Sequence, residues 1–266
     1  MLNMSKFKNR IKPFHKPIGI LLSLLFWAII WWIASAIYGR PLLLPSPLEV
    51  IPRAFGLLFT SRFWLFAGRT ILTLFLGYLF GSLLGFLLGV ITAKSPIANA
   101  LFTPLFSMLR ATPVACFIII AWVFLGSSRL PAVIAGLMVA PVMMTNVASG
   151  VKATPTPLLE TAKVLKLSLW DKIRACYLPT LLPYLSSGLI TSAGLAWKSG
   201  IAAEVIALSA DTLGFAVYEA KSWNMDTTEL FALTILIALF ALLGEWLLSL
   251  VLHTITKKRR TAHANT

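Results

Sequence analysis

The chain is dominated by long apolar runs that alternate with short polar connections. Six of these runs approach the roughly 20 residues that a transmembrane helix needs, and they lie at about residues 18–37, 70–92, 100–125, 131–148, 184–208 and 230–252. Hydrophobic residues make up 58% of the sequence and charged residues only 12%, whereas soluble domains are about 45–50% apolar. The sequence therefore predicts an all-α integral membrane protein with six spans in a domain at residues 18–252.

Basic residues set the expected orientation of these spans. The N-terminal segment at residues 1–17 holds five basic residues and no acid, and the tail at residues 253–266 holds four consecutive basic residues. By the positive-inside rule, both termini are expected in the cytoplasm. The net charge of +14 comes from these ends and from the polar connections, so it indicates membrane orientation rather than a nucleic-acid partner.

Two connections are expected on the outer side. Residues 38–68 are broken by four prolines and predict an external loop with a short interfacial helix, although arginines lie in and beside this loop, which mildly opposes the topology. Residues 209–229 hold four acids and one lysine, which fits the outer side.

Four glycines lie at strict four-residue spacing in the second span, at positions 77, 81, 85 and 89. Such a stripe allows the backbone of another helix to approach closely. That helix is expected in the same subunit or in a second copy of the chain.

A polar stretch at residues 149–183 interrupts the apolar runs. Leucines and Ala162 recur at helical spacing in its first half, and lysines lie between them, so it predicts an amphipathic helix. Pro179 and Pro183 then end this stretch before the next span. A bilayer gives no reason to keep such a helix between two spans, whereas a soluble cytoplasmic partner does.

This stretch resembles the EAA loop of permease subunits of bacterial ABC importers. Glu160, Ala162, Leu178 and Pro179 lie at the spacing of that signature, and Lys166 stands where the family has a glycine, which would form a sharp turn more readily. Three other stretches resemble the nitrate, sulfonate and taurine branch of these permeases: LPSP at 44–47, RATPVACF at 110–117 and AWKSGIAAEVI at 196–206.

The resemblance implies a type I ABC importer permease in the bacterial inner membrane. The cytoplasmic EAA coupling helix would contact two ATPase subunits, which would bind ATP and magnesium, through Glu160, Ala162, Lys166, Leu167, Ser168, Leu178 and Pro179. A second copy of the permease and an extracytoplasmic solute-binding protein would complete the transporter. The chain itself has no GxxxxGK[ST] phosphate loop, so neither a cofactor nor an enzymatic activity is expected on it.

Charged residues within the spans are candidates for the translocation pathway, because a charge in the membrane costs about 2.5–3.5 kcal/mol on insertion scales. Lys198 and Glu204 are the strongest candidates, with Trp197 beside them. The helical period turns Lys198 about 120° away from Glu204, so a direct pair between them is not expected. Arg110, Asn146 and Glu245 are weaker candidates, since each could instead lock helices together.

The predicted function is ATP-driven import of a small anionic solute of the nitrate, sulfonate or taurine kind. One alternative is an ion-coupled secondary transporter, which only Glu204 and Glu245 favour. Another is an ABC permease for a heterocyclic vitamin precursor. A membrane scaffold without transport would leave the charged spans unexplained.

Overall fold

The structure is a computed structural model that describes residues 15–40 and 42–264, with side chains from residue 19 to residue 254 within that range. The basic segment at residues 1–17 and the basic cluster at 257–260 lie outside the described side chains. Every regular element in the described part is a helix. In chain order these are α1 (His15–Tyr38), α2 (Pro47–Leu58), α3 (Ser61–Lys94), α4 (Pro96–Ala111), α5 (Val114–Lys152), α6 (Thr156–Val164), α7 (Leu169–Lys172), a π-helix at Ile173–Tyr177, α8 (Leu178–Ile206), α9 (Leu213–Ser222) and α10 (Thr227–Ala264).

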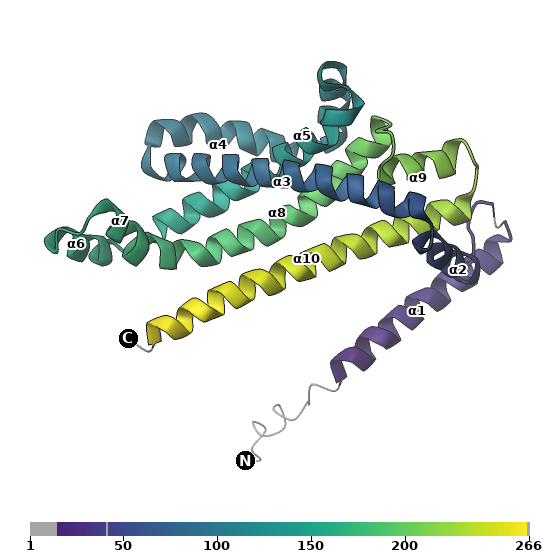
Figure 1. The fold of residues 1–266 in the computed structure, drawn as a ribbon, viewed down its shortest axis with the longest axis horizontal. Coiled ribbons are helices and arrows are strands. Elements are labelled where there is room, and N and C mark those ends of the chain that lie inside the picture. Colours follow the sequence, from purple (N-terminus) through teal and green to yellow (C-terminus); the bar gives the residue numbers. More distant parts are fainter. Residues whose placement is uncertain (1–14, 41, 265–266) are drawn as a thin grey trace, which may run out of the picture.

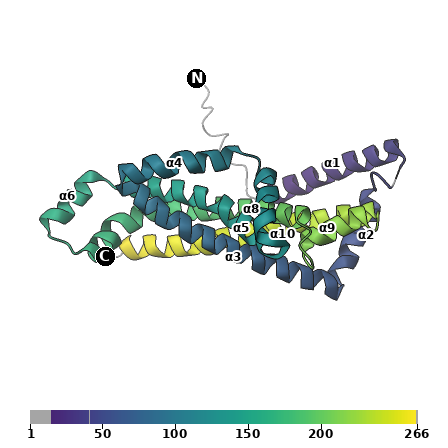
Figure 2. The same cartoon turned by 90° about the horizontal axis from the view of Figure 1, so that it is seen from above.

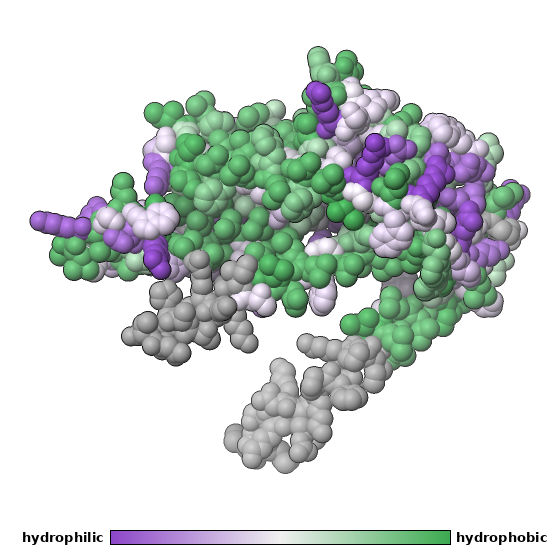
Figure 3. Space-filling model, in the orientation of Figure 1, coloured by the Kyte–Doolittle hydropathy of each residue, from purple (hydrophilic) through white to green (hydrophobic). Residues whose placement is uncertain are grey.

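The molecule is elongated along its long helices. Helices α3, α5, α8 and α10 run side by side, with α6 and α7 at one end and α2 and α9 at the other (Figure 1). Among the described residues, four helices are long and apolar enough to cross a membrane, and they cover Gly19–Tyr38, Ser61–Lys94, Val114–Lys152 and Thr227–Thr254. Figure 3 shows hydrophilic residues gathered at the two ends and apolar side chains between them. This distribution is that of a membrane-spanning bundle, and the count of six spans stays a prediction.

The glycine stripe of α3 packs against α5 of the same subunit. A Cβ added to Gly77 would lie 2.2 Å from the carbonyl oxygen of Ala132, and one added to Gly81 would lie 2.4 Å from that of Gly136. Ala132, Gly136 and Ala140 repeat every four residues on α5, so both helices present small residues at the seam. The close approach therefore serves packing within the subunit.

The sequence predicts one span at residues 100–125 with a kink near Pro113, and the structure divides this segment into two helices at that proline. α4 ends at Ala111, and α5 begins at Val114 after a break at Thr112 and Pro113. Proline disfavours the helical conformation of the residue before it and lacks an N–H, so Thr112 and Pro113 end the helix rather than bend it. Residues 126–130, which separate the expected spans at 100–125 and 131–148, contain one non-helical residue, Gly126, whose φ is 68°.

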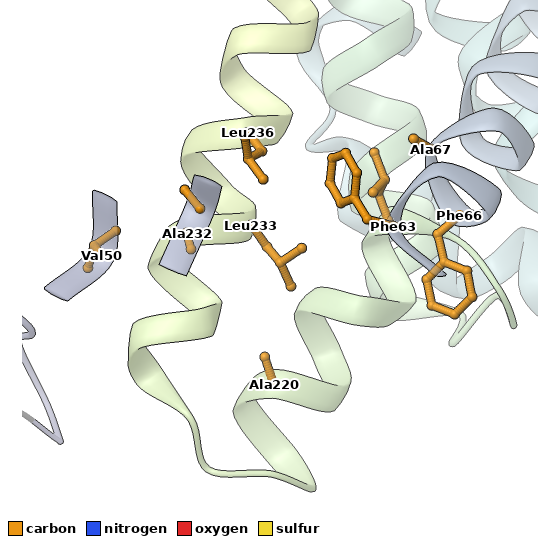
Figure 4. Close-up of a cluster of buried hydrophobic side chains, with 10 residues drawn as sticks. Val50, Phe63, Phe66, Ala67, Ala220, Ala232, Leu233 and Leu236 are labelled. Carbon is orange, nitrogen blue, oxygen red and sulfur yellow. The ribbon is translucent and has the colours of Figure 1, made fainter. Parts of the chain in front are cut away.

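The end of the molecule that carries α2 and α9 has its own core. Buried side chains from α2, α3, α9 and α10 meet there, among them Phe63, Leu233 and Ala220 (Figure 4). α1 diverges from the bundle (Figure 2) and contacts it through Trp31, whose ring stacks on that of Phe231 of α10 with 5.9 Å between the ring centroids. The Trp31 indole N–H also donates to the Pro45 carbonyl, in the connection to α2, at 3.1 Å.

Ion pairs join the two connections expected outside. The guanidinium Nη2 of Arg53 lies 2.5 Å from Oε2 of Glu229 and 3.6 Å from Oδ2 of Asp226. Nη2 of Arg62 lies 2.5 Å from Oε2 of Glu219. Arg69 pairs with Asp211. These arginines are therefore partnered by acids of residues 209–229, which accounts for basic residues at an end where the positive-inside rule does not expect them.

Candidate functional site

The predicted coupling residues lie at the end of the bundle opposite to α2 and α9. We call residues 155–179 the coupling segment; they leave α5, form α6 and α7, and return through the π-helix into α8 (Figure 1). Ala162 is 2% exposed and Cys176 is also 2% exposed, and the Cys176 thiol lies 3.9 Å from the Leu158 carbonyl. The π-helix thus packs against α6.

A sharp turn ends α6 at Lys166, the position at which the resemblance implies a glycine. The Leu167 N–H donates to the Ala162 carbonyl at 3.0 Å, and the Lys166 N–H donates to the Lys163 carbonyl at 3.0 Å. This pair of bonds defines a Schellman motif, which needs a left-handed residue after the helix end. Lys166 takes that conformation with a φ of 50°. The turn therefore forms here without glycine.

The second half of the coupling segment is fixed by a cap and by a proline. The Ser168 hydroxyl accepts from the Asp171 N–H at 3.2 Å and so caps α7. Pro179 lacks the N–H that an α-helix would require, and immediately before it the Leu178 N–H reaches back five residues to the Ile173 carbonyl. Leu178 and Pro179 thus lie where the segment joins α8.

The coupling segment exposes large apolar side chains, which is unfavourable if its surface faces water alone. Val164 and Leu169 are each 80% exposed, and Trp170 is 70% exposed. Glu160 is exposed beside them and Leu167 is half-buried. An exposed apolar patch rimmed by charged residues is typical of a protein interaction site.

A second candidate site is one side of α8, which we call the α8 open face. Its residues recur at helical spacing and are all exposed in the subunit: Tyr184, Ser187, Thr191, Leu195 and Lys198. Four of these five side chains are polar. The exposed side of α10 differs, because it presents Leu239, Leu242 and Leu243. The α10 side suits lipid, whereas the polar α8 open face suits water or another polypeptide.

Lys198 lies on this open face without an ion pair among the described residues. Arg110 is exposed in the last turn of α4 and likewise forms no ion pair in the described part of the chain. These two cations lie on different helices, α4 and α8.

Trp197 and Asn146 lie at contacts between helices rather than on an open face. The Trp197 indole N–H donates to the Ile237 carbonyl of α10 at 3.1 Å. The Asn146 amide donates to the Val142 carbonyl of its own helix at 2.9 Å, and its Cβ lies 3.0 Å from where a Cβ on Gly188 would be. Both side chains are half-buried at helix contacts.

Glu204 lies inside the subunit, between α3, α8 and α9, and its side chain is fully buried. Its Oε2 accepts from the Thr70 hydroxyl at 3.0 Å and from the Gly214 N–H at 3.0 Å. Glu204 therefore does not share the α8 open face with Lys198. As expected from the helical period, the two do not pair.

Sequence reasoning missed the ion pairs of Arg53, Arg62 and Arg69, although a signal for them existed. A connection with arginines at intervals and a distant connection with acids at intervals are complementary in charge, and both were expected at the same end. Opposite charges brought to one end of a bundle are candidates for pairing.

Comparison with known proteins agrees with this architecture. Residues 81–259 match the family described as binding-protein-dependent transport system inner membrane component. The bicarbonate transport system permease protein CmpB of Synechocystis is 30% identical over 150 residues, a match that covers 56% of this chain and 53% of that protein. The matched region thus spans about half the length of this relative.

Longer matches also occur. The nitrate import permease protein NrtB of Synechococcus elongatus is 27% identical over 229 residues, covering 82% of this chain and 80% of that protein. A bacterial ABC transporter involved in the import of the acidic polysaccharide alginate has a similar fold, with a TM-score of 0.60 at 16% identity and coverage of 91% of this chain and 96% of that chain.

Proposed function

The chain belongs to the family of binding-protein-dependent transport system inner membrane components, and from this premise we propose that it is the membrane-spanning subunit of an ATP-driven importer of a small anion. The observation that carries the proposal is the exposed apolar surface of the coupling segment at one end of a membrane bundle. In an ATP-driven transporter, a membrane subunit that has no phosphate-binding loop needs an ATPase partner, and this surface supplies a place to bind one.

The coupling segment would act as the contact with the ATPase. α6 follows α5 after a connection of three residues, and α8 begins directly after the π-helix, so movement of the segment is passed to two long helices. The Schellman turn at Lys166 and the Ser168 cap fix α6 relative to α7. A segment fixed in this way can transmit displacement instead of absorbing it.

The α8 open face would line the translocation pathway. Polar side chains exposed along a span are unfavourable against lipid, so the face requires water or a second subunit across from it. Lys198 would then provide positive charge for an anion. The names of two relatives, for bicarbonate and nitrate, support an anionic solute.

The rest of the transporter follows from the same assignment. Two cytoplasmic ATPase subunits would bind ATP and magnesium, a second copy of this chain would close the pathway, and an extracytoplasmic binding protein would deliver the solute. Both termini would lie in the cytoplasm, with the coupling segment on the same side of the inner membrane.

Recovery of an ATPase with the membrane-inserted chain tests the proposal. Glu160→Lys and Leu167→Glu should reduce the ATPase recovered, or uncouple ATP hydrolysis from uptake, because both residues lie on or beside the exposed surface of the coupling segment. Lys221→Glu is the matched control, since it reverses an exposed charge on α9 at the opposite end. Normal recovery and normal uptake in both coupling variants would contradict the assignment.

A further inference from the structure

The buried Glu204 side chain and its neighbour Thr70 accept hydrogen bonds from the first turn of α9. Thr70 of α3 donates its hydroxyl proton to Glu204 and, with the same oxygen, accepts from the Leu213 N–H at 2.9 Å. Glu204 accepts from the next N–H, that of Gly214. Two of the N–H groups that a helix leaves unpaired at its start are thus satisfied by side chains from α3 and α8.

Gly214 makes this arrangement possible by its size. A Cβ at Gly214 would lie 2.4 Å from the Glu204 Cβ and 2.9 Å from the Val205 backbone nitrogen. Any side chain there would push α9 away from α8 and lengthen the bond to the carboxyl group. The three elements are therefore fitted closely around Glu204.

The connection that precedes α9 is held in an unfavourable backbone conformation. Leu208 has a φ of 53° and Asp211 a φ of 56°, and left-handed residues other than glycine cost about 1–3 kcal/mol each. The Ser209 hydroxyl donates to the Ser127 carbonyl at 2.7 Å, beside the break at Gly126. Asp211 pairs with Arg69, the neighbour of Thr70. Several bonds from different helices thus oppose the local preference of this connection.

We propose that Glu204 is a positioning residue that holds the outer mouth of the subunit closed, where the outer mouth denotes residues 126–127 and 207–214. It acts through Thr70 and the first turn of α9, which keep residues 207–212 against Ser127. When these bonds are released, the left-handed residues can relax and the connection can leave Ser127. That this mouth is the outer one rests on the proposed function, whereas the bonds themselves do not.

The test uses a thiol reporter at Ala207, which is fully buried in the mouth. The full chain carries Ala207→Cys and Cys116→Ser and keeps Cys176, which is buried at the opposite end and reports global unfolding. Labelling by a maleimide is measured in permeabilised membranes, so the result depends neither on topology nor on an ATPase. Failure of this test is thus separable from failure of the proposed function.

Glu204→Ala and Thr70→Val should each raise the labelling rate at position 207 by about tenfold, because each removes two hydrogen bonds of the mouth, while Cys176 stays protected. Glu204→Gln keeps an acceptor oxygen for Gly214 and Thr70 and should label close to the parent rate. Ser199→Ala is the matched control, since its hydroxyl bonds only carbonyls of its own helix.

Labelling of Thr70→Val at the rate of the Ser199→Ala control would overturn the proposal. So would equal acceleration in Glu204→Gln and Glu204→Ala, since an acceptor would then not matter. If Glu204→Ala does not accumulate in membranes, the comparison of Thr70→Val with Glu204→Gln decides the question.

Discussion

Gly81 of α3 faces Gly136 of α5 so closely that a methyl group on Gly81 would lie 2.4 Å from the Gly136 carbonyl oxygen. The opposing atom belongs to the backbone of a helix and cannot move aside. Gly81→Ala should therefore lower the stability of the detergent-solubilised protein by about 1–3 kcal/mol, the usual cost of overpacking. Thermal unfolding followed by circular dichroism measures this loss.

Two other glycines give controls for that experiment. A Cβ on Gly194 would meet Oε1 of Glu245 at 2.1 Å, but this atom ends a flexible side chain that can rotate away. Gly244 has nothing within 4 Å. Gly194→Ala should be mild and Gly244→Ala should not lower stability. An unfolding temperature for Gly81→Ala equal to that of Gly244→Ala would show that α3 and α5 do not meet at this seam.

The left-handed residue at the end of α6 predicts the effect of restoring glycine. Lys166→Gly should stabilise the turn by about 1 kcal/mol, since glycine takes positive φ without steric cost. Hydrogen exchange of the Leu167 amide, which bonds Ala162, should slow. Lys163→Gly lies within α6 and should do the opposite, at a cost of about 0.5–1 kcal/mol. Faster exchange in Lys166→Gly would contradict the Schellman geometry.

Replacement of Lys198 tests the pathway. Lys198→Met should lower uptake of an anionic solute without loss of assembly, and Lys198→Arg should keep part of the activity, because the charge is retained on the α8 open face. Lys221→Met removes an exposed charge on α9, outside the α8 open face, and should leave uptake unchanged. Radiolabelled uptake into proteoliposomes with the ATPase and binding protein gives the measurement. Full uptake by Lys198→Met would remove the role assigned to this residue.

The ion pair of Arg53 and Glu229 predicts a charge-exchange result. Arg53→Glu should place a third acid beside Glu229 and Asp226 and so lower the unfolding temperature, and the added change Glu229→Arg should restore most of it. The effect should be small, because partly exposed pairs contribute about 0.2–1 kcal/mol, and it should shrink at high salt. Additive losses in the double variant would mean that the two residues are not partners.

Parts of this fold were predictable because the membrane constrains them strongly. The apolar runs gave the all-α bundle, and the four-residue glycine spacing indicated a helix seam. The sequence did not decide which helix forms that seam, since Ala132, Gly136 and Ala140 are an unremarkable set of small residues until α5 is placed beside α3. Pro113 signalled a change of direction, but its local effect on the chain could be a bend or a break.

The candidate sites were predictable to different degrees. Residues of the coupling segment could be located by their spacing, whereas the turn at Lys166 could not, because lysine takes positive φ only when surrounding bonds require it. The period of α8 correctly separated Lys198 from Glu204. It could not show which of the two is exposed, since that depends on α3 and α9, which pack against α8 from distant parts of the chain.

The glycine seam has a mechanical consequence. Because backbone atoms of α3 and α5 are in contact along several turns, the two helices cannot slide or separate without losing the seam, and they should move as one lever. From Ser127 to Lys152, α5 covers about 39 Å at 1.5 Å per residue. One end of this lever connects to α6, and the other end carries the Ser127 carbonyl, which accepts a hydrogen bond from the Ser209 hydroxyl. A tilt imposed at the coupling segment would thus reach the outer mouth directly, without passing through α1 or α10.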